Sequence, residues 1–290
     1  MKNRKGIILA GGAGTRLYPT THVVSKQLIP LYDKPMIYYP LATLMQGGMR
    51  EILIISTPDH IDLYKTLLKD GSQWGVEIQY ITQPSPDGLA QSFILGEEFI
   101  DESPSALILG DNFFYGNNLP SLLKEATDRR EISSIFAYHV KDPSRYGIVN
   151  FDSNNNVLDI EEKPNKPRSN FAVTGLYFYD ENAVRFAKEL SPSERGELEI
   201  TDLNKRYLKI KKLKVTILRS GFSWLDTGTH DSLLEASNFV SIIQNRQGLK
   251  IACLEQIALE NQWISIKDIE RQISSIGSNS YQEYLRSIIS

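Results

Sequence analysis

The sequence contains almost no cysteine and no long hydrophobic run. Its one cysteine, Cys253, cannot form a disulfide within the chain, and we interpret it as a small buried hydrophobic residue. No apolar segment approaches the ~20 residues of a membrane-spanning helix. Segment 1–12 is not typical of a secretory signal peptide, because its apolar run is short and leads into glycines. We therefore expect a cytoplasmic protein with no membrane partner.

The sequence also lacks an excess of positive charge. Its formal net charge is −3, whereas proteins that bind nucleic acids usually present a basic surface. Its histidines have no spacing typical of metal ligands; they are His22, His60, His139 and His230. We therefore expect no nucleic-acid partner and no structural zinc.

The chain is long and apolar enough to bury a large α/β core, with 290 residues of which 41% are hydrophobic. Up to about residue 130, short apolar segments alternate with helical ones, a pattern that predicts βαβ units and a parallel sheet. The expected strands are 6–10, 51–56, 76–81 and 105–110. The expected helices are 34–46, 60–70 and 89–100.

After Glu131 the rhythm changes to consecutive strands with short polar connections, which favours antiparallel pairing. These strands are expected at 133–140, 146–152, 156–163 and 171–180, with a turn at 152–156. Further strands are expected at 214–218 and 221–226, and helices at 180–190, 199–210 and 230–248. The last ~40 residues are predicted to form a small helical tail.

The segment "ILAGGAGTRLYP", residues 8–19, is typical of a strand that leads into a phosphate-binding loop. It is not a P-loop, because no lysine follows the glycines, and it lacks the third glycine of a dinucleotide fingerprint. Thr15 and Arg16 follow the glycines directly, and Lys26 lies ten residues after Arg16. Glycines let backbone N–H groups approach phosphate oxygens, and a guanidinium binds them in a planar fork. The alternative is a glycine turn beside a solvated arginine.

Two aspartates follow strand-like apolar runs, Asp111 in "ALILGDN" and Asp226 in "GFSWLD". Ligands bind beyond the carboxyl ends of parallel strands, so we expect both aspartates at one rim of the sheet. Mg²⁺ takes one or two carboxylates together with substrate phosphates, so this rim is a candidate magnesium site. Taken singly, each aspartate is better explained as the cap of a turn or helix.

The strand "VLDIEEKP" has an unusual inward face. Alternation places Leu158, Ile160 and Glu162 on one face, so that a carboxylate stands where an apolar residue is expected. A buried acid needs partners, and sugar hydroxyls would serve. The alternative is a strand that frays at Glu162. Lys163 and Arg195 offer cations for a phosphate, although each taken alone fits a surface charge.

Nine segments in order carry a resemblance to a known family: "LAGGAGTRLYP", "SKQLIP", "QPSPDGLAQ", "LGDN", "YGIV", "EEKP", "VTGLYFYD", "RGELEITD" and "WLDTGTHDSLLEA". The sequence resembles the short bacterial glucose-1-phosphate thymidylyltransferases from about Gly6 to the tail. The resemblance implies a Rossmann-like mixed, mainly parallel sheet flanked by helices. It further implies a core at 1–240, of which about 133–226 forms an antiparallel sugar-binding insertion, and a helical segment at 241–290 packed on the core.

The resemblance also implies an activity, in which dTTP and glucose 1-phosphate give dTDP-glucose and pyrophosphate with Mg²⁺. The product would enter the biosynthesis of dTDP-rhamnose, other deoxysugars and polysaccharides. A cytoplasmic homotetramer is implied as well. The reaction would be a direct in-line displacement, since no nucleophile with an adjacent base is evident.

The resemblance assigns roles to residues of this chain. The implied catalytic residues are Arg16 and Lys26. The implied nucleotide-binding residues are Leu9, Gly11, Gly12, Gly14, Thr15, Gln27, Gln83, Gly88 and Asp111, with Gln83 and Gly88 at the thymine edge. The implied sugar-phosphate-binding residues are Tyr146, Gly147, Glu162, Lys163, Val173 and Arg195. Asp111 and Asp226 are the implied ligands of Mg²⁺.

The residues alone leave three alternative functions open. The nearest is a related enzyme that uses UTP or another sugar phosphate. An NAD-dependent dehydrogenase is disfavoured by the missing fingerprint. A non-catalytic nucleotide-binding module would keep the glycine loop without needing Lys26, Asp111 and Asp226 together.

Overall fold

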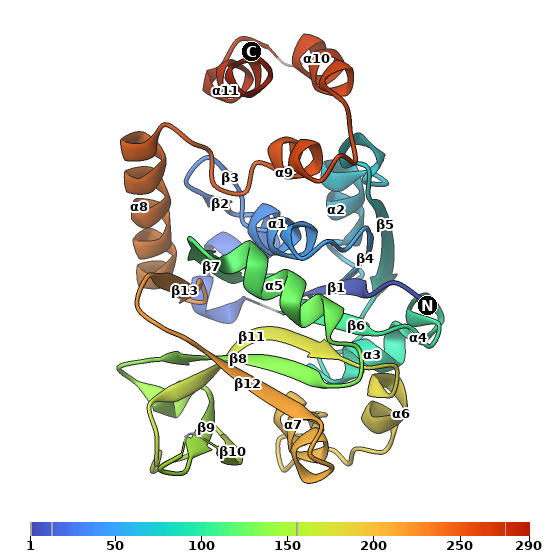
Figure 1. Ribbon diagram of the computed structural model, residues 1–290, viewed down its shortest axis with the longest axis vertical. Coiled ribbons are helices and arrows are strands. Elements are labelled where there is room, and N and C mark those ends of the chain that lie inside the picture. The colour runs from blue at the N-terminus through green and yellow to red at the C-terminus, as the bar shows by residue number, and fades with distance from the viewer. Residues whose placement is uncertain (1, 13, 155, 276) are drawn as a thin grey trace.

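A nine-stranded mixed sheet runs through the middle of the molecule, and helices cover both of its faces (Figure 1). The computed structural model describes residues 2–12, 14–154, 156–275 and 277–290. The main strand order is β10-β9-β11-β6-β1-β4-β5, and β8 and β12 continue the sheet from β11. The expected α/β class, with a mixed sheet flanked by helices, is confirmed.

The parallel half of the sheet consists of β6, β1, β4 and β5, which pair in that order. Alternate residues of these strands enter different cores: Ile8 and Ile54 lie in one cluster, whereas Ile7 and Leu53 lie in the other. This double burial explains why the strands are continuous apolar runs in the sequence. Their bounds are β1 Lys5–Ala10, β4 Glu51–Ser56, β5 Glu77–Thr82 and β6 Ser105–Leu109.

The second half of the sheet is joined through the long strand β11, which runs antiparallel to β6, β8 and β9. The ladder between β11 and β8 shifts register between Val173 and Tyr177, and on its other edge β11 pairs first with β9 and then with β6. Strand β12 pairs parallel with β8 at the outer edge. The bounds are β8 Ser133–His139, β9 Gly147–Phe151, β10 Val157–Glu162, β11 Phe171–Tyr179 and β12 Leu213–Leu218. Asn155, within the expected 152–156 turn, lies outside the described residues.

Two small antiparallel sheets accompany the large one. Strand β7 (Asn112–Gly116) pairs with β13 (Phe222–Asp226), and β2 (Pro30–Leu31) pairs with β3 (Lys34–Pro35). The β2–β3 pair corrects the helix expected at 34–46, which begins only at Tyr38, because Lys34 and Pro35 bond to a neighbouring strand. Strand β7 had no counterpart among the expected elements.

Helices pack against both faces of the sheet. Side chains of α1, α5 and α8 belong to one core cluster, and side chains of α3, α4, α6 and α7 belong to the other. The helix bounds are α1 Tyr38–Gln46, α2 Ile61–Leu68, α3 Gln91–Leu95, α4 Glu97–Ile100, α5 Leu119–Asp128, α6 Ala183–Lys188, α7 Ile200–Lys209 and α8 His230–Gln247.

The tail forms three further helices at the end of the long axis opposite β9 and β10 (Figure 1). They are α9 Leu254–Glu260, α10 Ile266–Ser275 and α11 Ser280–Ile289. Cys253 is buried with Ile269 and Leu285 in a small cluster of their own, as expected for a hydrophobic residue. Among the residues that the structure describes, no helix has the length and apolar character that crossing a bilayer requires.

Candidate active site

A cavity of about 490 Å³ opens where the glycine loop, the β6–β7 turn, β10 and β13 meet. Three of the expected phosphate and metal residues line it, Arg16, Asp111 and Asp226. All of the expected sugar-phosphate residues line it too: Tyr146, Gly147, Glu162, Lys163, Val173 and Arg195. The fold thus brings together residues that lie more than 200 positions apart in the chain.

Asp111 lies in the tight turn between β6 and β7, and its side chain is 16% exposed. The Lys26 ammonium contacts Asp111 Oδ2, and Asn112 Nδ2 donates to Asp111 Oδ1 at 2.9 Å. Burial would raise the pKa of Asp111, but the charge and hydrogen bond of Lys26 outweigh it, so the pKa lies below its usual value. Asp111 is therefore a permanently ionised carboxylate at neutral pH.

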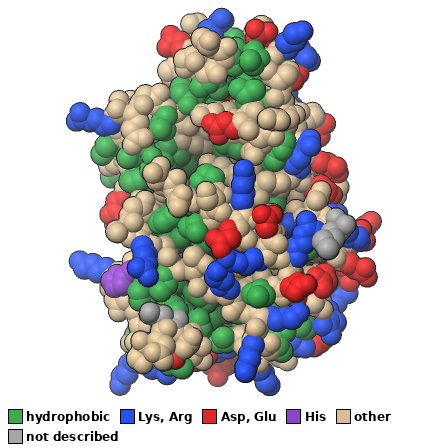
Figure 2. All heavy atoms as spheres, viewed as in Figure 1, with side chains coloured by type: hydrophobic (Ala, Val, Ile, Leu, Met, Phe, Trp, Pro, Cys, Tyr) green, Lys and Arg blue, Asp and Glu red, His purple; other side chains and the backbone are tan. Residues whose placement is uncertain are grey.

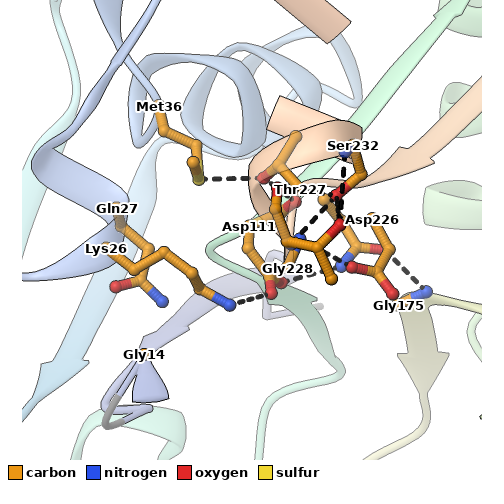
Figure 3. A network of polar contacts seen from close by, with 12 residues as sticks. Gly14, Lys26, Gln27, Met36, Asp111, Gly175, Asp226, Thr227, Gly228 and Ser232 are labelled. Carbon is orange, nitrogen blue, oxygen red and sulfur yellow. Dashed lines mark hydrogen bonds and ion pairs between the residues drawn. The ribbon is translucent and has the colours of Figure 1, made fainter. Parts of the chain in front are cut away.

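Asp226 also lines this cavity, but its strand is not part of the parallel sheet as expected. Strand β13 pairs with β7 instead, and Asp226 stands opposite Asn112 in that ladder. The ladder therefore sets Asp226 beside Asp111 without a shared rim of parallel strands. Thr227 continues the link, since its N–H and its hydroxyl both donate to the Asp111 carbonyl, at 3.1 and 2.8 Å (Figure 3).

Cations surround the Asp226 carboxylate. Its Oδ2 lies 3.6 Å from Arg145 Nη2, and its Oδ1 accepts from the Gly228 N–H at 2.8 Å. A Cβ at Gly228 would lie 2.8 Å from Arg16 Nη2, so the guanidinium of Arg16 packs directly over this turn. Arg16, from the short helical turn Thr15–Leu17, therefore lies close to Asp226 although its side chain is exposed.

Tyr146 and Trp224 form an aromatic wall beside Asp226, with ring centroids 5.2 Å apart. Burial, the negative charge of Asp226 and a hydrogen bond to that carboxylate together raise the pKa of Tyr146. The Tyr146 hydroxyl therefore stays protonated at neutral pH and can act as a donor.

Glu162 also lines the cavity. Thr201 Oγ1 donates to Glu162 Oε2 at 2.6 Å, and Lys163 Nζ and Arg195 Nη2 each lie 3.6 Å from Oε1. A Cβ at Gly147 would come within 3.3 Å of Glu162 Oε2, so a glycine there leaves room beside the carboxylate. The strand does not fray at Glu162, which pairs with Gly147 in the β9–β10 ladder.

The predicted inward face of β10 was wrong in one respect. Leu158 is 60% exposed, whereas Ile160 is fully buried. The ladder shifts register between Val157 and Asp159, and this bulge turns Leu158 away from the core. Alternation therefore holds only from Asp159 onward, which still directs Glu162 into the cavity.

Arg195 is held by several carboxylates rather than by one. Its Nη2 lies 2.7 Å from Glu199 Oε1, 3.4 Å from Glu197 Oε2 and 3.6 Å from Glu162 Oε1. Burial would lower the pKa of Arg195, but these carboxylates, Glu199 above all, raise it instead. The guanidinium is thus positioned at the cavity wall before any phosphate arrives.

The expected base-binding residues, Gln83 and Gly88, are not among the residues that line this cavity. Gln83 follows β5 and is 3% exposed, and its Oε1 lies where a Cβ at Gly11 would stand. Gly88 has a φ of +107°, and a Cβ there would overlap the backbone of Leu198. Only glycine satisfies both conditions at position 88.

The remaining expected nucleotide residues are spread along the same loop. Leu9 is buried in the core, Gly12 and Thr15 are exposed, and Gly14 has a φ of +62°. Ala13 of the loop lies outside the described residues. Lys26 and Gln27 are both buried, and Gln27 Oε1 accepts from Ser25 Oγ at 2.8 Å. Figure 3 shows the Lys26 side chain directed toward Asp111.

Sequence reasoning missed several lining residues. Trp224 stands two positions before Asp226 on the same face of β13, a spacing that alternation could have revealed. Asn112 accepts from Trp224 Nε1 at 2.6 Å and from the Gly175 N–H at 3.1 Å, which no local pattern predicts. Thr201 and Arg145 likewise reach the cavity only through the tertiary fold.

The carboxylates of Asp111 and Asp226 are a donor set that fits a hard divalent cation. Asp111 and Asp226 supply carboxylate oxygens, and Mg²⁺ characteristically combines one or two carboxylates with substrate phosphate oxygens. Within the described ranges, no cluster of three or more His, Cys, Asp or Glu residues could hold a metal by itself.

Three comparisons place the chain among known proteins. A family model described as "Nucleotidyl transferase" matches residues 5–242. A glucose-1-phosphate thymidylyltransferase from Neisseria gonorrhoeae is 56% identical over 98% of this chain and 99% of its own length. One of the same name from Mycobacterium tuberculosis is 48% identical over 98% of this chain and 99% of its own length.

Solved structures agree on the fold. A putative glucose-1-phosphate thymidylyltransferase from Bacillus anthracis, in complex with a sucrose, superposes with a TM-score of 0.75 at 41% identity, covering 81% of this chain and 94% of that one. A UDP-glucose pyrophosphorylase complexed with UDP-glucose superposes with a TM-score of 0.73 at 26% identity, covering 83% of this chain and 99% of that one.

Proposed function

This chain belongs to the nucleotidyl transferase family and, within it, to the glucose-1-phosphate thymidylyltransferases, and from this premise we propose that it joins the thymidylyl group of dTTP to glucose 1-phosphate. The products are dTDP-glucose and pyrophosphate. The observation that carries the proposal is that one cavity is lined by two groups of residues with different chemistry. We propose that Arg16, Asp111 and Asp226 handle the phosphates of the nucleotide, and that Glu162 with the cations beside it binds the sugar phosphate.

The nucleotide is proposed to lie along the loop after β1. Glycine backbone N–H groups approach phosphate oxygens closely, and Lys26 and Arg16 neutralise them. The residues proposed for this part are Leu9, Gly11, Gly12, Gly14, Thr15 and Gln27, with Gln83 and Gly88 at the base. The buried Gln83 amide can both donate and accept, as the edge of a pyrimidine requires.

The sugar phosphate is proposed to bind next to Glu162. The Glu162 carboxylate accepts from sugar hydroxyls, and Thr201 fixes its orientation. Lys163 and Arg195 stand beside it for the phosphate, held by carboxylates that a phosphate would partly replace. Tyr146, Gly147 and Val173 complete the wall.

Enzymes of this family generally use a divalent metal ion, and we propose Mg²⁺ held by Asp111 and Asp226. A bound Mg²⁺ supplies charge stabilisation at the α-phosphate. The carboxylates that line the cavity are a reason why a cation is needed for two anionic substrates to bind there. Carboxylates outnumber Lys and Arg among the described lining residues, so two polyanionic substrates would otherwise face net repulsion.

The proposed chemistry is a single displacement. A phosphate oxygen of glucose 1-phosphate forms a bond to the α-phosphorus, and the bond from that phosphorus to the bridging oxygen of pyrophosphate breaks. Arg16 and Lys26 stabilise the charge that develops on the transferring phosphoryl group. No cysteine, serine or histidine is found among the described lining residues, which favours direct attack.

Pyrophosphate release tests the proposal. The purified chain should release pyrophosphate from dTTP only when glucose 1-phosphate is present, and dTDP-glucose should appear in equal amount. UTP and galactose 1-phosphate are the informative competitors, because a structural relative is a UDP-glucose pyrophosphorylase. Release with UTP but not dTTP would replace the proposal by uridylyl transfer, and nucleotide binding without release would indicate a binding module.

We further propose a homotetramer in the cytoplasm whose product enters dTDP-rhamnose and related deoxysugar biosynthesis. Exposed apolar side chains on α8 support subunit contacts: Leu234 is 61% and Ile242 is 60% exposed. Sedimentation equilibrium measures the number of subunits in the assembly directly.

Charged side chains of both signs are interspersed over the face in Figure 2, which gives no basic patch for nucleic acid on that face.

A further inference from the structure

Three polar side chains form a chain from the surface to the glycine loop. Gln83 Nε2 donates to Gln91 Oε1 at 2.6 Å, and Gln91 Nε2 donates to Asp87 Oδ2 at 2.8 Å. Ser85 Oγ donates to the same Asp87 oxygen at 2.6 Å. Asp87 is exposed, Gln91 is half-buried and Gln83 is 3% exposed, so the chain connects a solvated charge to a buried amide.

The carboxylate of Asp87 fixes the direction of both amides. An ionised carboxylate only accepts hydrogen bonds, so Gln91 must turn its NH₂ group toward Asp87 and its carbonyl oxygen toward Gln83. Gln83 must then turn its own NH₂ group toward Gln91. Its Oε1 is left facing Gly11 in the glycine loop, where the structure places it.

We propose that Asp87 and Gln91 are positioning residues that set the base selectivity of this chain through Gln83. Held in this orientation, Gln83 presents a carbonyl acceptor beside the second N–H of its amide. A pyrimidine with a protonated N3 and a 4-oxo group, thymine or uracil, offers the complementary donor and acceptor. The inference rests on the proposed function, in which the base lies at Gln83.

Cytosine presents the opposite pattern, an acceptor at N3 and a donor at its 4-amino group. Binding it would require the Gln83 amide to rotate, and Gln91 would have to rotate in turn. The carbonyl oxygen of Gln91 would then face the Asp87 carboxylate with no proton between them. This mismatch would leave a hydrogen-bonding group of the half-buried Gln91 without its partner. Such a loss lowers affinity by about tenfold, so we expect cytosine to be disfavoured by a charge that it does not contact.

Nucleotide selectivity in matched variants tests the inference. The measurements are the dissociation constants of dTDP and dCDP by calorimetry, and kcat/KM for dTTP and dCTP with glucose 1-phosphate. Asp87→Asn leaves an amide that can either accept from or donate to Gln91, so both directions of the chain become available. We expect its dTDP-over-dCDP preference to fall about tenfold, mainly through improved dCDP binding.

A double variant and a remote control sharpen the result. The double variant Asp87→Asn with Gln91→Glu moves the carboxylate from position 87 to position 91. There it can only accept a hydrogen bond from the Gln83 NH₂ group, so the preference for dTDP over dCDP should be restored. Glu77→Gln makes the same chemical change on β5, where Glu77 Oε1 accepts from Gln79 Nε2 at 2.8 Å, and should leave the preference unchanged.

Two outcomes would overturn the inference while leaving the proposed function standing. One is an unchanged preference in Asp87→Asn; the other is an equal loss of affinity for both nucleotides, which indicates a merely structural role. A wild-type chain that binds neither dTDP nor dCDP would overturn the inference and the proposed function together.

Discussion

At the residue scale, the charged side chains of the cavity are paired with one another. Lys26 contacts Asp111, Arg145 stands near Asp226, and Arg195 is held by Glu199. These pairs keep each charge in place before substrate arrives, which lowers the entropic cost of forming the bound state. In the proposed complex, substrate phosphates and a divalent cation would replace some of these partners. A single substitution should therefore weaken the binding of one ligand more than that of the other.

The carboxylate of Glu162 provides the first such test. Glu162→Gln keeps an oxygen to accept from Thr201 but loses the charge that attracts sugar hydroxyls, Lys163 and Arg195. We expect glucose 1-phosphate affinity to fall by about tenfold while dTTP affinity is retained, since hydrogen bonds to charged groups contribute roughly 1.5–3 kcal/mol. Calorimetry with each ligand measures the split.

The neighbouring residue supplies the control. Glu161→Gln makes the same change one position earlier, where the carboxylate pairs with Asn150 and Arg168 instead of the cavity. It should leave both affinities unchanged. Equal losses for both ligands in Glu162→Gln would refute its assignment to the sugar.

The proposed magnesium site is tested by the variants Asp226→Asn and Asp111→Asn. Each should lose most activity and require more Mg²⁺, because each removes one anionic oxygen from the proposed site. The double variant should lose little beyond either single one, since residues that act as a unit are not additive. Activity against Mg²⁺ concentration is the measurement, and a wild-type Mg²⁺ curve in either single variant would make that aspartate a structural cap.

At the element scale, local pattern predicted the parallel strands well and the small β7–β13 sheet poorly. Strand 51–56 was predicted at its observed bounds, because a run buried on both faces is legible in the sequence. Strand β7 follows β6 after a single turn, and its glycine- and aromatic-rich sequence has no clear alternation. Its partner β13 lies about a hundred residues later, so the pairing depends on the tertiary fold.

The same dependence on the tertiary fold decides which residues of the candidate site could be predicted from the sequence. Glu162 was identifiable because a carboxylate interrupts an apolar face, and Asp111 because it ends an apolar strand. Thr201 was missed because nothing near it in the sequence distinguishes it from other helix residues, whereas Trp224 could have been found from its i, i+2 spacing to Asp226. The bulge that exposes Leu158 was also invisible, since a register shift depends on the facing strand.

The loop 84–88 offers a test at this scale. Gly88→Ala must both adopt a φ of +107° and displace the Leu198 backbone, whereas Gly48→Ala faces only a φ of +85° in open space. Strain of this kind costs roughly 1–3 kcal/mol. We expect Gly88→Ala to lower both the melting temperature and dTDP affinity by more than Gly48→Ala does. Equal effects would mean that the contact with Leu198 is unimportant.

At the scale of the whole molecule, the family model ends at residue 242, inside α8, and the tail lies beyond it. We propose that residues 1–240 form the catalytic core, with 133–226 serving the sugar, and that 241–290 form a helical segment packed on it. Helix α8 links these parts as one continuous element, which begins with a capping box at Thr229 and ends at Gly248.

The single cysteine reports on the packing of the tail. Burial, together with the negative charge of Glu255, raises the pKa of the Cys253 thiol to about 12. We expect Ellman's reagent to label the native chain at pH 8 far more slowly than the chain in guanidinium chloride. Leu285→Ala, which opens the cluster around Cys253, should accelerate labelling, whereas Ile266→Ala at an exposed site should not. Rapid labelling of the native chain would contradict this packing of the tail.

The central claim is that glucose 1-phosphate attacks the α-phosphorus of dTTP directly within this one cavity. Turnover of dTTP carrying a chiral α-phosphorothioate tests it, because one displacement inverts the configuration at phosphorus and two restore it. Direct attack should give a dTDP-glucose analogue with inverted configuration at the α-phosphorus. Retention would contradict it and would require a nucleotidylated residue of the enzyme as an intermediate.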